Sequence, residues 1–167
     1  TPPIAITMGD PAGIGSEVII KALQQASQNG LQGPFVIYGD PEWLAQVSRA
    51  LEADTGLLEV VPCASVPSSL QIGQNSAGGG DAAFQCVRQA ALDAVAGKVR
   101  AVVTAPLSKA AMNMAGHAYP GHTEILAHLA GDVPVRMMLA NEELRTVLVS
   151  IHVPLRQAID GLSTAGI

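Results

Sequence analysis

The sequence predicts an α/β fold with a mostly parallel sheet, and three observations support this class. Short apolar runs alternate with segments of helical periodicity along most of the 167 residues. Gly, Pro, Asp or Ser follows most of the apolar runs, as expected where a strand ends and a helix begins. The chain is 49% hydrophobic but only 3% aromatic, which is typical of small-residue strands covered by helices on both faces.

The first apolar run, residues 4–8, reads as a strand, and a glycine-containing turn, Gly9–Gly15, leads from it into a helix over 16–26. Ser16 is expected to cap this helix. The turn is compatible with phosphate binding, but its spacing is neither GxGxxG nor a Walker loop, and a purely structural turn is the simpler interpretation. Asp10 is interpreted as a helix-start residue rather than as part of a cleft.

The next elements repeat this pattern. Residues 34–39 read as a strand, and Asp40 followed by Pro41 is a strong helix start, for a helix that continues to about residue 53. Residues 57–61 read as a third strand. We expect a loop over 66–80, including its glycine run, and a helix over 81–96 that ends at Gly97.

The second half begins with an apolar run, residues 99–103, expected to be a buried strand that ends at Thr104. Helices are expected over 107–114 and 123–130. Residues 135–139 and 144–149 then predict a β-hairpin, and a last helix starts at Pro154.

Charge and composition exclude several classes of function. The formal net charge is −5 and no basic stripe is present, so we expect no nucleic-acid partner. No apolar run is long enough to cross a bilayer and no signal-peptide pattern opens the sequence, so we expect no membrane partner and a cytoplasmic location. Cys63 and Cys86 lack CxxC spacing and are expected to be reduced thiols.

Candidate site residues follow the strand that ends at Thr104. Lys109 stands at this edge, where it could bind an anionic group of a substrate or be an ordinary solvated lysine. His122 and Thr123 open the next helix, and a helix start carrying such side chains can hold an anion. His152 ends a strand, where it is a candidate metal ligand or a hydrogen-bonded structural group.

Four ordered motifs carry a resemblance to a known family: Thr7–Glu17, Val103–Lys109, Pro120–Glu124 and Ser150–Arg156. On these motifs the chain resembles the 4-hydroxythreonine-4-phosphate dehydrogenase family, which includes relatives acting on D-threonate or D-erythronate 4-phosphate. The resemblance implies a layered α/β sandwich like that of isocitrate and isopropylmalate dehydrogenases. It also implies oxidation of an alcohol, followed by decarboxylation, in pyridoxal 5′-phosphate biosynthesis.

The same resemblance implies the ligands and the assembly. Members use NAD or NADP and a divalent metal, for which zinc, cobalt, magnesium and manganese are candidates, and they are homodimers. His122 and Thr123 match the substrate-binding pair of the family, and His152 matches its first metal histidine, whereas no cofactor-binding residue is assigned. The phosphorylated substrate is a small molecule, and Lys109 stays a candidate catalytic residue.

The resemblance further implies a partial chain. We expect residues 1–167 to be the N-terminal portion of a two-lobed dehydrogenase, with the first lobe over about 1–120 and the start of the second over about 121–167. The other two metal histidines of the family are then expected beyond Ile167, and the fragment alone is expected to be inactive. Two alternatives stay open: a phosphate acyltransferase-like enzyme, which needs neither nicotinamide nor metal histidines, and an inactive product of truncation.

Overall fold

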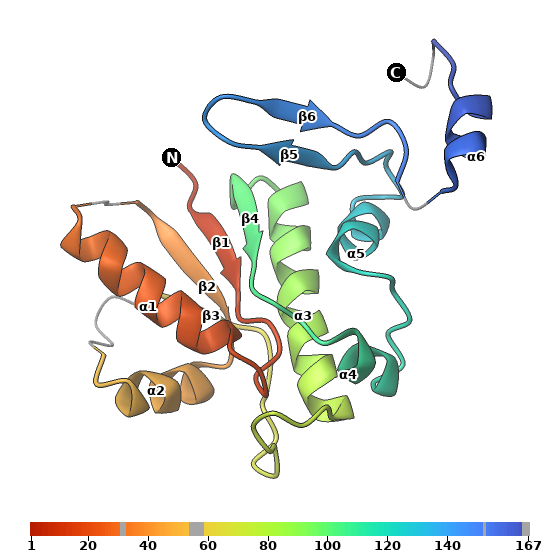
Figure 1. Ribbon diagram of the computed structural model, residues 1–167. Helices are drawn as coiled ribbons and strands as arrows, with labels where there is room; N and C mark the ends of the chain where they lie inside the picture. The colour runs from red at the N-terminus through yellow and green to blue at the C-terminus, as the bar shows by residue number, and fades with distance from the viewer. Residues whose placement is uncertain (31–32, 54–58, 152, 165–167) are drawn as a thin grey trace. The chain divides into compact units, whose positions relative to one another are not determined.

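A computed structural model describes residues 1–30, 33–53, 59–151 and 153–164 (Figure 1). The chain divides into two compact units, Thr1–Asp132 and Val133–Ile167. The elements follow in the order β1 (Ile4–Thr7), α1 (Gly15–Gln28), β2 (Phe35–Gly39), α2 (Pro41–Ala50), β3 (Val60–Pro62), α3 (Ala77–Val95), β4 (Ala101–Thr104), α4 (Lys109–Met114), α5 (His122–Leu129), β5 (Met138–Ala140), β6 (Arg145–Val147) and α6 (Leu155–Asp160).

The first unit is built on a parallel four-stranded sheet with the strand order β3-β2-β1-β4. In its register Thr7 at the end of β1 is aligned with Tyr38 of β2 and with Thr104 of β4. The carboxyl ends of these strands therefore meet at one edge. This arrangement confirms the predicted α/β class and the mostly parallel sheet.

Helix α3 packs against β1, β2 and β4, and α4 and α5 in turn pack against α3, as Figure 1 shows. One hydrophobic cluster joins the sheet to α1, α2 and α3, and it includes Ile19, Ile37, Leu44 and Ala90. A second cluster, around Phe84, Val87, Met112 and Ile125, joins α3 to α4 and α5. This second cluster fixes the position of α5 relative to the sheet.

The glycine run before Asp81 was expected to be a loop, but it lies inside α3, which begins at Ala77. The side chain of Ser76 caps the helix by accepting a hydrogen bond from the Gly79 backbone N–H at 3.1 Å. A Cβ atom at Gly80 would overlap the backbone of Ala111 in α4. The glycine is therefore a contact residue that allows two helices to approach closely.

Two other local expectations were wrong. The fourth strand was expected to be buried, but β4 is the last strand of the sheet and Val103 in it is 51% exposed. Ser16 was expected to cap α1, but it is the second residue of that helix and is buried, and its Oγ has no hydrogen-bond partner within the part of the chain that the structure describes. In contrast, Asp40 caps α2 as predicted, accepting from the backbone N–H groups of Glu42 and Trp43.

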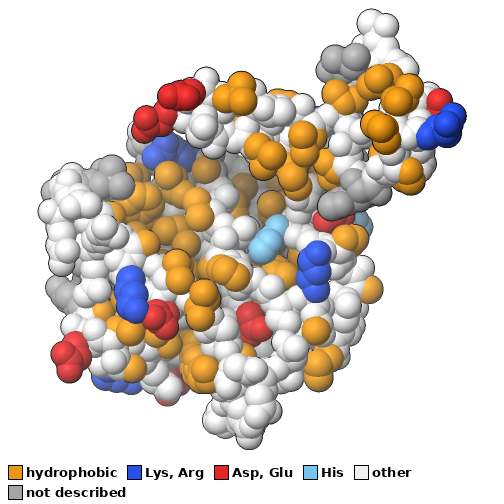
Figure 2. Space-filling view, viewed as in Figure 1, with side chains coloured by type: hydrophobic (Ala, Val, Ile, Leu, Met, Phe, Trp, Pro, Cys, Tyr) orange, Lys and Arg blue, Asp and Glu red, His pale blue; other side chains and the backbone are white. Residues whose placement is uncertain are grey.

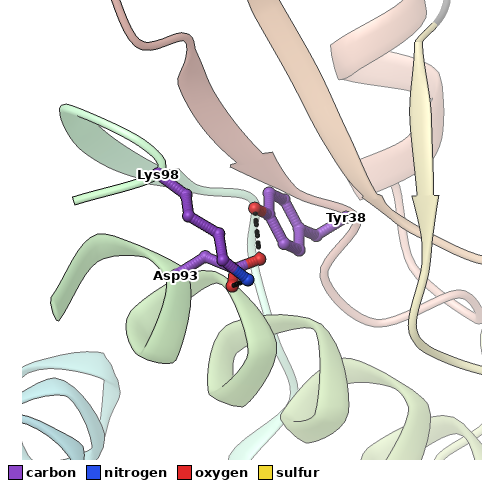
Figure 3. Close-up of polar contacts among 3 residues, drawn as sticks. All are labelled: Tyr38, Asp93 and Lys98. Atoms are coloured by element: carbon purple, nitrogen blue, oxygen red, sulfur yellow. Dashed lines mark hydrogen bonds and ion pairs between the residues drawn. The ribbon is translucent and has the colours of Figure 1, made fainter. Parts of the chain in front are cut away.

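A polar network crosses the core between β2 and the end of α3 (Figure 3). The Tyr38 hydroxyl donates to Asp93 Oδ2 at 2.8 Å, and Lys98 Nζ donates to Asp93 Oδ1 at 2.9 Å. The Lys98 ammonium, helped by Tyr38, lowers the pKa of the Asp93 carboxyl although burial opposes the shift. Burial, with Asp93 as neighbour, raises the pKa of the Tyr38 phenol. Asp93 is therefore a paired buried carboxylate.

The two cysteines are free thiols, as predicted. Cys86 is buried in α3, and Cys63, just after β3, packs against the same hydrophobic cluster. Their separation along the chain gave no sign that they share one cluster.

The second unit contains the predicted hairpin. Strands β5 and β6 pair antiparallel, with Leu139 opposite Thr146, and helix α6 follows. None of the described residues of this unit is buried. Hydrophobic side chains cover much of its surface on the face shown in Figure 2. Among the described residues, no helix has the length and apolar character needed to cross a bilayer.

Candidate functional site

The turn after β1 is tied to the loop after β4. Gly9 has φ of +73°, and a Cβ atom there would overlap the carbonyl oxygen of Pro106. The backbone N–H of Asp10 donates to that same carbonyl at 2.9 Å. The motif glycine thus allows two strand-end loops to approach more closely than any other residue would permit.

These two loops line a cavity of about 320 Å³ at the carboxyl edge of the sheet. The chain leaves β1 toward β2 on one side, whereas β4 pairs on the other side of β1. Such a reversal of strand order is where open parallel sheets bind ligands, because the loops on either side diverge. The residues lining the cavity are Asp10, Ala12, Gly13, Ile14, Gly73, Gln74, Asn75, Pro106, Leu107 and Ser108.

The polar side chains of this cavity are held in place. Asp10 is 6% exposed, and its Oδ1 accepts a hydrogen bond from the Ala12 backbone N–H at 2.9 Å. The hydroxyl of Ser108 donates to Asn75 Oδ1 at 2.6 Å and also accepts from the Ala111 backbone N–H. Asp10 therefore serves both interpretations considered from the sequence, since it orders the turn and lines the cleft.

The predicted site residues that the structure describes lie beside this cavity and are not among the residues that line it. They are Lys109, His122 and Thr123. Lys109 is the first residue of α4, and its Cε atom would lie 3.9 Å from a Cβ atom built at Gly121, the N-cap residue of α5. His122 and Thr123 are the first two residues of α5 and are partly buried. The structure thus brings the Lys109 side chain to the start of the helix that carries His122.

The environment of His122 favours a neutral ring. Burial lowers the pKa of this imidazole, and a hydrogen bond to the backbone carbonyl of Ala105 only partly opposes the effect. Nε2 is buried and has no hydrogen-bond partner among the described residues. In a neutral imidazole one ring nitrogen donates and the other accepts, so Nε2 is available to bond to a ligand. A hydroxyl, which can both donate and accept, is a natural partner for this atom.

The other histidines of the first unit have protein partners. His117 Nε2 lies 2.8 Å from Asp81 Oδ1, and its ring stacks on Phe84. His128 Nδ1 lies 3.1 Å from Asp132 Oδ1 on the exposed side of α5. Both rings are therefore held by contacts within the first unit.

The predicted metal ligand, His152, lies outside the described residues. Within the described ranges, no group of three or more His, Cys, Asp or Glu side chains could hold a metal ion. Those residues alone do not form a metal site. The expected convergence of His122 and His152 on one pocket stays a prediction.

Sequence reasoning missed Asn75 and undervalued Asp10. Asn75 lies in a segment that read as a featureless loop, and its role depends on the Ser108 hydroxyl, 33 residues away. Asp10 offered a usable signal: it is a carboxylate between a strand and a glycine turn, at the sheet edge where ligands bind. Without the strand order, that edge could not be identified as a switch point.

Comparison with known proteins places these observations in a family. The family model described as "Pyridoxal phosphate biosynthetic protein PdxA" matches residues 14–167. A curated relative from Salmonella typhimurium, named D-threonate 4-phosphate dehydrogenase, is 42% identical over 99% of this chain and 55% of its own length. One from Beijerinckia indica, named 4-hydroxythreonine-4-phosphate dehydrogenase, is 39% identical over 94% of this chain and 50% of its own length.

Solved structures agree with the sequence matches. A 4-hydroxythreonine-4-phosphate dehydrogenase from Burkholderia phymatum superposes with a TM-score of 0.86 at 37% identity, covering 99% of this chain and 55% of that one. The chain therefore spans about half the length of the curated relatives it matches. These matches confirm the resemblance seen in the motifs: the chain belongs to the PdxA family.

Proposed function

We propose that this chain is the N-terminal portion of an NAD(P)-dependent dehydrogenase that oxidises the alcohol of a four-carbon phosphorylated acid. The substrate is 4-hydroxythreonine 4-phosphate or a relative such as D-threonate 4-phosphate, the compounds named for the relatives described above. Oxidation followed by decarboxylation in pyridoxal 5′-phosphate biosynthesis is the corresponding role. The complete enzyme would be a homodimer with two lobes and the isocitrate dehydrogenase-like sandwich fold, dividing near residue 120.

The unpartnered Nε2 atom of His122 is the observation that carries this proposal. A buried polar atom without a hydrogen bond costs about 1–3 kcal/mol, which a bound donor would recover. An alcohol is such a donor, and Nε2 of a neutral His122 would orient it. Thr123, next in the helix, adds a hydroxyl that can donate or accept.

Lys109 would bind the negatively charged end of the same substrate. Its side chain lies at the start of α5, where backbone N–H groups also favour an anion. This division assigns the phosphate or carboxylate to Lys109 and the alcohol to His122. Lys109 is then a substrate-binding residue, which refines its earlier status as a candidate catalytic residue.

The nicotinamide cofactor, when bound, accepts the hydride that leaves the alcohol carbon. The role of this chain is to hold the alcohol in one orientation and to exclude water from it. A divalent metal held by His152 together with residues beyond this chain is part of the proposal. The described residues do not by themselves form the site of that metal.

The direct test is an activity measurement on the full-length protein. With D-threonate 4-phosphate or 4-hydroxythreonine 4-phosphate, a divalent cation and NAD+ or NADP+, we expect the absorbance of reduced nicotinamide to appear. In a second assay that supplies an acyl thioester and inorganic phosphate, formation of an acyl phosphate with release of the thiol would instead establish the acyltransferase alternative. His152→Ala should abolish both metal binding and hydride transfer, and survival of either would remove His152 from the proposal.

A matched pair of histidine variants tests the substrate site. His122→Ala should lower kcat/KM for the phosphorylated substrate by a factor of about 10–100, in line with the loss of one or two hydrogen bonds to a substrate in a water-excluded site. His128→Ala removes an exposed histidine from the same helix and should leave kcat/KM within about twofold of the wild type. Equal losses in both variants would indicate a general disturbance of α5.

A further inference from the structure

The cavity between the β1–α1 turn and the β4–α4 loop has no ligand assigned to it by the family motifs. It adjoins the proposed substrate site: Ser108 lines the cavity, and Lys109, the next residue, reaches the start of α5. A second ligand bound here would therefore lie close to the substrate. Since a dehydrogenase brings two ligands together, this cavity is a candidate for the cofactor.

The size of the cavity limits what it can hold. At about 320 Å³ it is at the lower end of ligand pockets, which span about 300–1,000 Å³. A whole dinucleotide would not fit, whereas a single nucleoside would. The rest of such a ligand would have to extend beyond the described residues of the cavity.

The charges of the lining disfavour a diphosphate inside the cavity. Among the described residues that line the cavity, none is Lys or Arg, and Asp10 contributes a carboxylate. A diphosphate would be repelled by that carboxylate and would find no cation to pair with. The lining instead offers Gln74, Asn75 and Ser108, which suit hydroxyl and amide groups.

Asp10 has one carboxylate oxygen to offer. Oδ1 is used by the Ala12 backbone N–H, whereas Oδ2 has no hydrogen-bond partner in the described part of the chain. An acceptor-only oxygen at a strand end matches the vicinal hydroxyls of a ribose, the contact that acidic residues make in dinucleotide-binding folds. Asn75, whose Oδ1 accepts from Ser108, keeps its amide hydrogens for a second contact.

The rim of the cavity supplies a surface for a heterocycle. Ile14 is 61% exposed although it is a large aliphatic residue, and it lines the cavity with Leu107. An aromatic base stacked on this side chain would remove apolar area from water, which favours binding. The cavity thus combines an apolar rim with a hydroxyl-binding interior.

We propose that this cavity binds a ribonucleoside half of the nicotinamide dinucleotide, with Asp10 Oδ2 accepting hydrogen bonds from the ribose hydroxyls. The inference rests on the proposed dehydrogenase function and adds the cofactor-binding residues that sequence reasoning left unassigned. Asp10 holds the ribose, Asn75 contacts it through an amide positioned by Ser108, and Ile14 packs against the base.

The test is equilibrium binding of NAD+ to the full-length protein without substrate, measured by isothermal titration calorimetry. Asp10→Asn keeps the bond to Ala12 through Oδ1 and replaces only Oδ2 by a donor, so we expect binding to weaken at least about tenfold. The KM for the phosphorylated substrate at saturating NAD+ should stay unchanged. Asp132→Asn removes the same charge from an exposed position outside the cavity and should bind NAD+ as the wild type does.

A second variant keeps the proposal testable if Asp10→Asn does not fold. Gly13 lines the cavity, and a Cβ atom there would meet only Asp10, at 3.4 Å or more, so Gly13→Leu adds bulk to the cavity without changing its charge. It too should weaken NAD+ binding at least about tenfold. If Asp10→Asn does not fold, the result for Gly13→Leu decides.

Each outcome has a distinct meaning. Wild-type NAD+ affinity in both cavity variants, with NAD+-dependent oxidation intact, would overturn this site and leave the proposed function standing. Failure of the wild-type protein to bind NAD+ or NADP+ and to oxidise either phosphorylated acid would overturn the proposed function, and this inference with it.

Discussion

The two units of the chain differ in what holds them together. The first unit, Thr1–Asp132, buries a hydrophobic cluster under its sheet, a second cluster under α5, and the paired carboxylate of Asp93. The second unit, Val133–Ile167, buries none of its described side chains, and Leu139 and Leu144 of its hairpin are 60% and 66% exposed. A two-stranded hairpin without a covered face is marginal in water.

The two units therefore differ in the kind of contact that determines their structure. The first unit has its own core, so its fold and the cavity built on it depend on contacts within the described residues. The hairpin is specified by local pairing and by the turn at Asn141, whose side chain accepts from the backbone N–H groups of Glu143 and Leu144. The same apolar residue type should therefore contribute very differently in the two units.

The largest expected effect comes from a buried leucine of the first unit. Leu44 in α2 is 1% exposed and packs in the main hydrophobic cluster. Leu44→Ala should lower the free energy of unfolding by about 3 kcal/mol, since both transfer and cavity costs are incurred. Chemical denaturation of the chain, followed by far-ultraviolet circular dichroism, measures this loss. A loss below about 1 kcal/mol would contradict the close packing of this core.

The next effect comes from the polar network of Figure 3. Asp93→Ala leaves the buried Tyr38 hydroxyl without its acceptor and should cost about 1.5 kcal/mol. The double variant with Tyr38→Phe removes both partners and should recover part of that loss. An additive double variant in the same denaturation experiment would show that the two side chains do not act as a pair.

A smaller effect is expected with pH. The folded state lowers the pKa of His122 below its ordinary value of 6.5. Between the lowered pKa and 6.5, the unfolded chain therefore binds more protons than the folded chain does. The contribution of His122 to stability is present above pH 6.5 and is lost as the pH falls through its lowered pKa. His122→Gln should therefore reduce the loss of stability that occurs as the pH falls from 7.5 through the lowered pKa of His122. Denaturant titration at each pH measures this loss. An unchanged pH dependence would indicate a solvated ring.

Asp93 contributes to the pH dependence with the same sign. Its lowered pKa means that its stabilising effect is present above the ordinary value of 3.8 and is lost as the pH falls through the lowered pKa.

The sequence predicted those parts of the fold that depend on local rules. The strand at residues 4–8, the Asp40–Pro41 helix start and the hairpin around Asn141 follow from periodicity and capping, and each is present. The glycine run before Asp81 was misassigned because its conformation is set by contact between α3 and Ala111, which no local pattern reveals. The exposure of β4 likewise depends on strand order.

The residues of the candidate site also divide into those that local sequence patterns indicate and those that only the folded chain brings together. Lys109 and His122 were proposed as site residues because each stands where an element begins or ends, and the position of Lys109 beside the start of α5 follows from the packing of α5 on α3 and α4. Asn75 could not be found, since its position depends on a hydrogen bond to a residue far along the chain. His152 was found only through a motif, and its role stays a prediction.

The smallest expected effect is that of a leucine in the second unit, shortened by the same substitution as Leu44 in the first unit. Leu144→Ala in the hairpin should change the free energy of unfolding of the 167-residue chain by less than about 0.5 kcal/mol, because the side chain is already in water. Leu44→Ala is the matched control, measured in the same denaturant series. A loss that grows with protein concentration would mean that a second copy covers the hairpin, since association stabilises by mass action. A loss above about 1 kcal/mol that does not depend on concentration would mean that the hairpin packs within its own chain, and the contrast between the two units would then fail.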